Sequence, residues 1–348
     1  SITHDRPASY VALSRNAVRV PSAAVDLDAW IRCGHDTPSS FLRQHTDLLP
    51  IRQLLTKLHL DPDELGPGFE RDGFPLDQPI GSDRSAADWR ARFDDPDLRA
   101  SLLRQAEAER SLLVDYLGQH QLLTDERIGV VDIGWRGQQA AMMTAVAESA
   151  SNVHLHHFHL GRDQAEALLH PVRIERYLFD CDRPVVDNAV ALFETLAATT
   201  EPGMTGLRRE GDTVQPVYRQ DHDPVRESPH IDPLHRIVTD VTERLADRLE
   251  PHHGSDEIRE RIIANAQAFW LDPSLEEASY WTSLPFERDA SGRAIATLGA
   301  PLGTADMMPI LTRTWAGRQW VAGSISISHP ATRGIISAAY RRRNRSRR

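Results

Sequence analysis

The sequence predicts an α/β protein whose core is a mostly parallel sheet, with a helical insertion and a mostly helical C-terminal part. Short apolar segments typical of buried strands alternate with helical segments through the centre of the chain, which favours parallel pairing. Helical periodicity prevails on either side of this centre. We therefore expect an α/β core over 1–220 with the insertion at about 36–120, a helical region over 221–339 and an arginine-rich tail over 340–348.

The first expected element is a short buried strand, Tyr10–Leu13, which ends at Ser14 and Arg15. Because the chain begins with serine and reaches this strand almost at once, we expect earlier residues of a longer protein to be missing. Pro50 then precedes apolar residues spaced i, i+3, i+4 and i+7, which predict a helix over 51–58.

The rest of the insertion contains a loop and a long helix. Residues 61–79 include four prolines and three glycines, a composition that predicts a loop. Asp95 is suited to cap the helix that follows, and Pro96 to occupy its first position. Gly118 is expected to end that helix in the left-handed conformation.

The centre of the chain changes period several times, from strand to helix and back. The expected elements are a strand over 128–131, a tight loop over 132–137, a helix over 138–147, strands over 154–160 and 173–180, and a helix from Asp187 to about residue 198. Helical spacing returns over 232–249 and 256–270, and no clear period follows Pro285.

The charged residues exclude several classes of function. Arginine supplies 39 of the 40 basic residues, and Lys57 is the only lysine. A P-loop needs its lysine after a glycine, whereas Lys57 follows a threonine, so that loop is absent. A Schiff-base enzyme or a kinase would have to use Lys57, which lies in an expected amphipathic helix.

The net charge of −10 is unevenly distributed, because six arginines lie within the last nine residues. The acidic remainder argues against nucleic acid as a partner. We expect the basic end to be solvated and disordered, although it also suits contact with an anionic membrane surface or RNA. No apolar stretch is long enough to span a bilayer, no signal peptide is visible and only two cysteines are present, so a cytoplasmic location is expected.

The strongest local motif runs from Val131 to Gln138. An apolar strand ends at Asp132, and Gly134 and Gly137 follow, three residues apart, before a helix. Glycines allow a ligand to approach the backbone, and the N-terminus of the helix favours a phosphate. Asp132 is suited to hold a ribose hydroxyl, a metal such as Mg²⁺ on a phosphate, or a transferable proton. The alternative is a structural turn whose aspartate caps the helix.

Three arginines are expected at the carboxyl ends of neighbouring strands, where α/β folds bind ligands. Arg15 follows the first strand, Arg136 lies in the glycine loop and Arg162 ends the histidine-rich strand. Together they suit a phosphorylated sugar or nucleotide. The alternative is that all three form surface ion pairs.

Glu194 is the second candidate catalytic residue. It lies on the apolar stripe of the helix expected from Asp187, so we expect a partly buried carboxylate. Burial would suit it to act as a general base. The alternative is a structural ion pair with an arginine.

The histidine-rich strand is a weaker candidate, for a metal site. In a strand, His157 and His159 share one face, while His154 and His156 share the other. Two histidines per face without a nearby carboxylate make a poor zinc site, so we expect half-buried structural histidines and no metal.

Three segments together resemble a known family: Tyr10–Arg15, Val131–Gln138, and Phe193–Gly206. The chain resembles the region that follows the phosphatase-like domain in bacterial predicted HAD-superfamily hydrolases associated with cell-surface polysaccharide (rhamnan-type) biosynthesis. The likeness covers roughly residues 8–220. The matching positions are Ser14, Arg15, Asp132, Gly134, Trp135, Arg136, Gly137 and Glu194.

This resemblance implies a cytoplasmic component of bacterial cell-surface polysaccharide biosynthesis. In that family the HAD catalytic aspartates belong to a region upstream, so HAD phosphatase activity is not expected from this chain alone. If the chain is an enzyme, we expect a transferase acting on a phosphorylated sugar or nucleotide, with Gln138 among the ligand-binding residues. The alternative is a non-catalytic module that docks a glycosyltransferase or a membrane surface.

Overall fold

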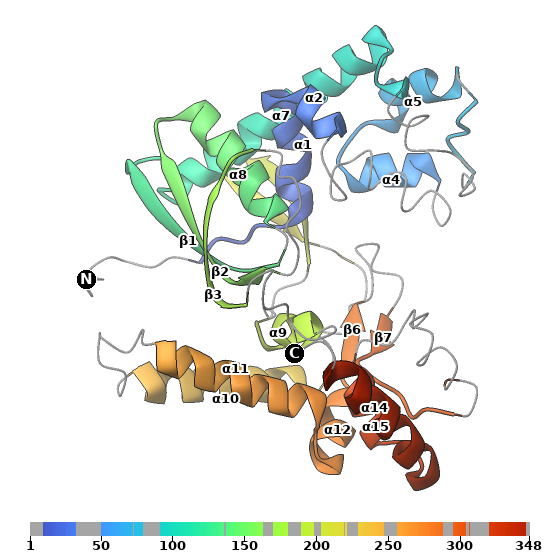
Figure 1. Cartoon of the computed structure of the whole chain (residues 1–348). Coiled ribbons are helices and arrows are strands. Elements are labelled where there is room, and N and C mark those ends of the chain that lie inside the picture. The colour runs from blue at the N-terminus through green and yellow to red at the C-terminus, as the bar shows by residue number, and fades with distance from the viewer. Residues whose placement is uncertain are drawn as a thin grey trace. The chain divides into compact units, whose positions relative to one another are not determined.

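The computed structural model describes residues 10–32, 50–71, 73–78, 91–135, 137–162, 170–179, 189–197, 203–218, 220, 229–246, 256–287, 295–303, 306 and 320–345. The chain divides into two compact units (Figure 1). The N-terminal unit comprises residues 5–176 and 202–220, and the C-terminal unit comprises residues 1–4, 177–201 and 221–348.

A small parallel sheet organises the N-terminal unit. Its strands, in spatial order, are β1 (Arg127–Trp135), β2 (His154–Arg162) and β3 (Arg173–Phe179), and the last three residues of β3 are counted with the C-terminal unit. β1 and β2 pair in parallel. β3 begins at the same edge as β2, because His170, just before β3, and His154, the first residue of β2, contact the same carboxylate of Glu148. The expected α/β class is confirmed.

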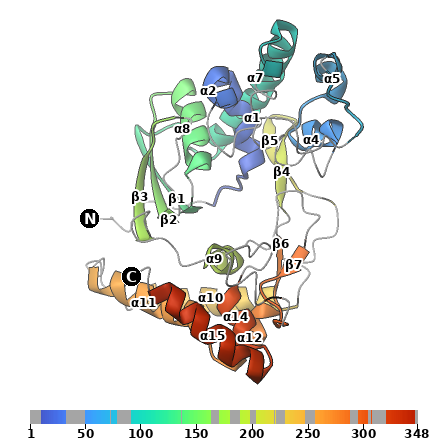
Figure 2. The same ribbon diagram turned by 45° about the vertical axis from the view of Figure 1, so that its right-hand side comes forward.

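Helix α8 (Gln138–Ala150) connects β1 to β2 and covers one face of the sheet (Figure 2). Alanine and methionine are frequent in it, and the small side chains allow its backbone to pack closely against α1 (Arg15–Val25). Buried residues of α8 join Leu155 of β2 and residues of α1 and α7 (Pro96–Gln119) in one apolar cluster. This cluster is the core of the sheet region.

The opposite face of the sheet is open. Val131, in the middle of β1, is 85% exposed, and its register neighbour Phe158 on β2 is 39% exposed. Parallel sheets are normally covered on both faces. Apolar side chains are thus exposed where a second covering layer is usual.

The expected strand at Tyr10–Leu13 is wrong, because the backbone groups of this segment bond to side chains and not to a neighbouring strand. The Tyr116 hydroxyl donates to the carbonyl of Ala12, and the Gln139 side-chain amide donates to the carbonyl of Leu13. Ser14 then caps α1 by accepting a hydrogen bond from the Ala17 amide. Arg15 is therefore the first residue of a helix, not the end of a strand.

The insertion is helical, as expected, but the loop predicted over 61–79 is shorter than expected because it contains a helix. Its described helices α4 (Ile51–Lys57) and α5 (Pro62–Glu70) pack with the first half of α7. α2 (Leu27–Arg32), which precedes the insertion, joins the same apolar cluster. The predicted loop over 61–79 is wrong at α5, since Asp61 caps this helix and Pro62 starts it. The glycines serve close packing: a Cβ on Gly66 would lie 2.4 Å from a methyl carbon of Leu76.

The long helix α7 begins as predicted, with Asp95 accepting hydrogen bonds from the Asp97 and Leu98 amides. Its predicted end is wrong, because Gly118 lies within the helix. The left-handed conformation is taken by Gln121, with φ of +60°. An antiparallel hairpin, β4 (Met204–Glu210) and β5 (Thr213–Tyr218), was not expected and packs against α7.

The C-terminal unit is mostly helical in its described part, as expected. Its elements are α9 (Ala189–Ala197), α10 (Ile231–Ala246), α11 (Asp256–Leu271), α12 (Leu275–Thr282), a short hairpin of β6 (Pro285–Glu287) and β7 (Ile295–Thr297), α14 (Val321–Ser326) and α15 (Pro330–Arg345). Trp320 stacks on Trp270 at 5.1 Å between ring centroids, and its indole N–H donates to the Trp270 carbonyl at 2.8 Å. This pair fixes α14 against α11.

The arginine-rich tail differs from expectation, because the backbone of α15 stays helical through Arg345. Pro330 starts this helix, and Arg341 to Arg343 continue it without a break. In the part of the chain that the structure describes, no helix combines the length and the apolar character needed to cross a membrane.

Candidate functional site

The predicted loop after Asp132 is shorter than expected. Asp132, Ile133, Gly134 and Trp135 belong to β1, which runs beside β2 as far as Arg162. The predicted loop over 132–137 is therefore wrong in extent, because parallel pairing continues four residues beyond Val131. What remains is the sharp connection between Trp135 and the start of α8 at Gln138.

Gly134 is required where it lies. Its φ is +95°, a conformation that favours glycine, and a Cβ at this position would lie 2.6 Å from atoms of the His159 side chain. His159 is 2% exposed and lies on β2 opposite Asp132 in the register. The motif thus brings an aspartate and a buried histidine onto neighbouring strands.

Gly137 shapes the start of α8. Its φ is +77°, it occupies the N-cap position, and no side chain of the cap bonds to the first turn of the helix. Gln138, the first helical residue, is 4% exposed. A helix N-terminus of this kind favours an anion through its amide N–H groups and its positive dipole end.

The N-terminus of α1 lies beside that of α8. The Gln139 side-chain amide bonds to the Leu13 carbonyl at 3.1 Å, one residue before the Ser14 cap of α1. α1 and α8 then pack along each other. The structure therefore brings Ser14 and Arg15 to the same end of the sheet region as Gly137 and Gln138. The sequence predicted this proximity, but through a strand at Tyr10–Leu13 that the structure does not contain.

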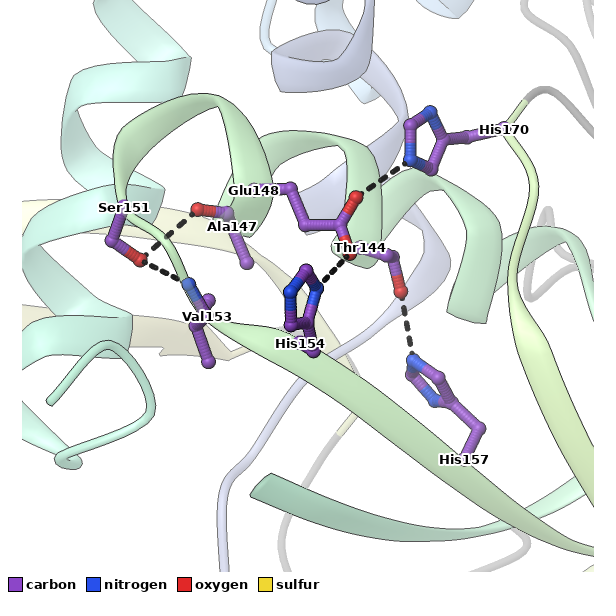
Figure 3. A network of polar contacts seen from close by, with 8 residues as sticks. All are labelled: Thr144, Ala147, Glu148, Ser151, Val153, His154, His157 and His170. Atoms are coloured by element: carbon purple, nitrogen blue, oxygen red, sulfur yellow. Dashed lines mark hydrogen bonds and ion pairs between the residues drawn. The ribbon is translucent and has the colours of Figure 1, made fainter. Parts of the chain in front are cut away.

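The histidines of β2 differ in their surroundings. His157 and His159 are fully buried under α8, where half-buried histidines were expected, and His156 contacts Glu175 of β3. His154, at the start of β2, is exposed and contacts Glu148 of α8. The Thr144 hydroxyl of α8 and the His157 Nε2 atom are 2.9 Å apart (Figure 3). Burial, together with nearby His159 and His156, lowers the pKa of His157 to about 4. His157 is therefore neutral in the folded protein near pH 7.

A second set of polar contacts joins α8 to β2 and to the start of β3. Figure 3 shows Glu148 between His154 and His170, with oxygen–nitrogen distances of 3.4 and 3.0 Å. In the same view the Ser151 hydroxyl donates to the Ala147 carbonyl and accepts from the Val153 amide. These contacts close the end of α8 away from the candidate site, so their role is structural.

The position of His159 is a feature that sequence analysis did not use. It lies opposite Asp132 only because the two parallel strands pair in the observed register. The sequence does carry one signal, since positions 157 and 159 share a face and the strand is rich in histidine. The register that joins 159 to 132 depends on contacts far apart in the chain.

For several predicted ligand-binding residues, the structure describes the backbone but not the side chain, or does not describe the residue. Arg162 is the last residue of β2 and pairs in register with Trp135, but both side chains lie outside the described part. Arg136 lies outside the described residues altogether. The convergence of Arg15, Arg136 and Arg162 on one ligand stays a prediction.

The two candidate catalytic residues belong to different units. Asp132 lies on β1 in the N-terminal unit, whereas Glu194 lies on α9 in the C-terminal unit. Glu194 is partly buried, in accordance with its position on an apolar stripe, and it already makes an interaction of its own. Neither unit by itself contains both carboxylates.

The described residues contain no group of three or more histidine, cysteine, aspartate or glutamate side chains arranged to hold a metal ion. Asp132 offers one carboxylate. Mg²⁺ commonly binds through one or two carboxylates, with further oxygen ligands supplied by substrate phosphates and water. Asp132 therefore fits Mg²⁺ only if the ion arrives with a phosphorylated ligand.

Comparison with known proteins adds no relative to this description. No family model matches the chain, and no curated protein matches it.

Proposed function

We propose that this protein binds a phosphorylated sugar or nucleotide at the end of β1, between the N-termini of α1 and α8. One observation carries the proposal: two helix N-termini lie together at the end of the sheet where β1 finishes, three residues beyond Asp132. Each N-terminus favours negative charge, and a phosphate placed between them is attracted by both. Sugar phosphates and nucleotides combine such a group with hydroxyls for which Asp132 is a suitable acceptor.

The proposed roles follow from these positions. The amides that follow Gly137 and the guanidinium of Arg15 would hold phosphate oxygens. Asp132 would accept a hydrogen bond from a ligand hydroxyl or hold Mg²⁺ on the phosphate. In the wider role that we propose, a cytoplasmic component of bacterial cell-surface polysaccharide biosynthesis, the ligand is a sugar donor and the reaction is group transfer. The resemblance at Asp132, Arg15 and Glu194 supports that role.

A thermal-shift experiment on the full chain tests the binding. UDP-glucose, glucose 1-phosphate and phosphoribosyl diphosphate should raise the unfolding temperature, and glucose should not. A ligand at about 100 times its Kd stabilises the folded state by roughly 2.7 kcal/mol, which is easily measured. The shift should be lost in Asp132→Asn. Asp125→Asn, at an exposed position just before β1, is the matched control and should keep it.

Two results would contradict the proposal. One is the absence of a shift with every phosphorylated compound. The other is a shift of equal size in Asp132→Asn and Asp125→Asn, because the ligand would then bind elsewhere.

A second candidate function is a non-catalytic docking module, and the open face of the sheet favours it. Val131 and Phe158 are exposed there. A partner such as a glycosyltransferase would supply the layer that usually covers a parallel sheet. This interpretation predicts co-purification with a partner from the native source, reduced in Val131→Asp, and no thermal shift with phosphorylated sugars.

A further inference from the structure

The C-terminal unit contains a cavity that the proposed function does not use. Its volume is about 230 Å³, and it lies where the end of α11, the start of α12, α14 and the first half of α15 meet. It is partly open to solvent. Pockets that hold drug-sized ligands begin at roughly 300 Å³, so this cavity suits a smaller molecule.

One wall of the cavity is apolar and well packed. Leu271 of α11 and Ala322 and Ile325 of α14 line it, and the two α14 residues are 3% and 4% exposed. α14 is held by the stacked pair Trp270 and Trp320. The apolar surface is therefore part of a fixed core and is suited to an aliphatic group.

The other wall is polar and carries Arg333. The hydroxyl-bearing residues Ser326 and Ser337 line the cavity beside it. The guanidinium makes one long hydrogen bond, at 3.4 Å, to the carbonyl of Ser326. No ion pair joins Arg333 to any carboxylate among the residues that the structure describes. Asp272, also on the wall, already has an interaction of its own.

Arg333 is exposed to solvent and lies where a helix favours an anion over a cation. It is the fourth residue of α15, near the positive end of the helix dipole, and the first turn of α15 contains no acidic residue. Cations are disfavoured at helix N-termini and anions are favoured there. A carboxylate in the cavity would satisfy Arg333 and this helix end together.

We propose that this cavity is a binding site for a small aliphatic carboxylate. The carboxylate pairs with Arg333 near the hydroxyls of Ser326 and Ser337, and the aliphatic part packs on Leu271 and Ile325. The site is independent of Asp132, which lies in the other unit.

Isothermal titration calorimetry on the full chain tests the site, with hexanoate as the probe. Hexanoate should bind, and hexanamide, which has the same shape without the charge, should bind at least about tenfold more weakly. Arg333→Gln should lower the affinity for hexanoate by at least about tenfold. Arg236→Gln, at an exposed position on α10, is the matched control and should leave it unchanged.

A second variant separates ligand binding from folding. Ser337→Leu places a larger side chain at the cavity and should block hexanoate while the unfolding temperature stays close to that of the wild type. A peptide that ends in leucine with a free carboxylate carries the same chemistry. Binding of this peptide in preference to hexanoate would support the site and identify polypeptide C-termini, not free metabolites, as its source of carboxylate.

Equal affinities for hexanoate and hexanamide would overturn the proposal, as would the absence of hexanoate binding or an unchanged affinity in Arg333→Gln. Asp132→Asn should have no effect on hexanoate. Failure of this site is therefore distinguishable from failure of the phosphate site, whose test uses different ligands and different variants.

Discussion

At the scale of single residues, Gly134 is constrained both by its backbone and by its neighbour. Its φ of +95° disfavours any residue with a Cβ, and the His159 ring occupies the space that a Cβ would need. Packing therefore accounts for the glycine without any ligand, and approach of a ligand stays a proposal. A glycine two residues after an aspartate is consistent with both, and the pattern alone could not separate them.

Gly134→Ala should lower the free energy of unfolding by about 2 kcal/mol or more, because it adds backbone strain and a clash with His159. Gly118→Ala is the matched control. Gly118 lies inside α7 with open space around it, so the alanine should stabilise the protein by about 0.5–1 kcal/mol. Urea unfolding of both variants measures the two effects. A neutral Gly134→Ala would mean that β1 and β2 lie further apart than described.

His157 should make the protein sensitive to acid. Its pKa in the folded protein is about 4, below the ordinary value of 6.5, so below pH 6.5 the unfolded chain takes up a proton that the folded chain does not. The free energy of unfolding therefore decreases as the pH falls from 6.5 to 4, and the loss at pH 5 relative to neutral pH is about 2 kcal/mol.

His157→Gln, which keeps a side chain able to bond to Thr144, should remove this part of the pH dependence. Urea unfolding at pH 7 and pH 5 measures it, with His154→Gln, at an exposed position on the same strand, as the control. If the two variants lose equal stability between pH 7 and pH 5, burial of His157 is not the cause.

At the scale of elements, the sequence was most informative where periodicity is strong and local. The helices over 51–58, 138–147 and 256–270 and the strand over 154–160 lie close to the observed α4, α8, α11 and β2. The residue pattern that predicts each of these elements is contained within the element itself. The wrong predictions concern segments that depend on distant partners. Residues 10–13 do not form the expected strand, and their carbonyls accept hydrogen bonds from Tyr116 and Gln139. The hairpin β4–β5, which was not expected, packs on α7.

Helix α5 shows why prolines and glycines were misleading. Pro62 starts the helix, and Gly66 and Gly68 allow Leu76 and Leu98 to approach it. The same residue types mark loops when no partner lies against them. The candidate site was also predicted only in part. The sequence indicated the Asp132 motif, but only the folded chain shows that His159 lies opposite Asp132 and that the N-terminus of α1 lies beside that of α8.

Asp61→Ala should lower the free energy of unfolding by about 1 kcal/mol, because the Asp61 carboxylate accepts a hydrogen bond from the Asp63 amide at the start of α5. Asp61→Asn keeps a hydrogen-bond acceptor at the cap, so its free energy of unfolding should fall by only about 0.3 kcal/mol. Thermal and urea unfolding measure both. If residues 61–79 behaved as the loop first predicted, the two variants would be equally neutral.

At the scale of the whole molecule, the chain forms two compact units, each with a core of its own. Proteins with more than one unit often depart from two-state unfolding. Calorimetry should therefore resolve two transitions. A phosphorylated sugar should raise only the transition that Gly134→Ala lowers, and hexanoate should raise only the other. A single transition that responds to both ligands would contradict this division.

The stacked Trp270 and Trp320 rings allow unfolding of the C-terminal unit to be followed by circular dichroism. Two indoles held face to face at 5.1 Å couple their electronic transitions, and the resulting circular-dichroism signal disappears once the rings separate. The protein thus carries a built-in optical reporter for one half of its polypeptide, which can be followed during heating or titration without attaching a dye.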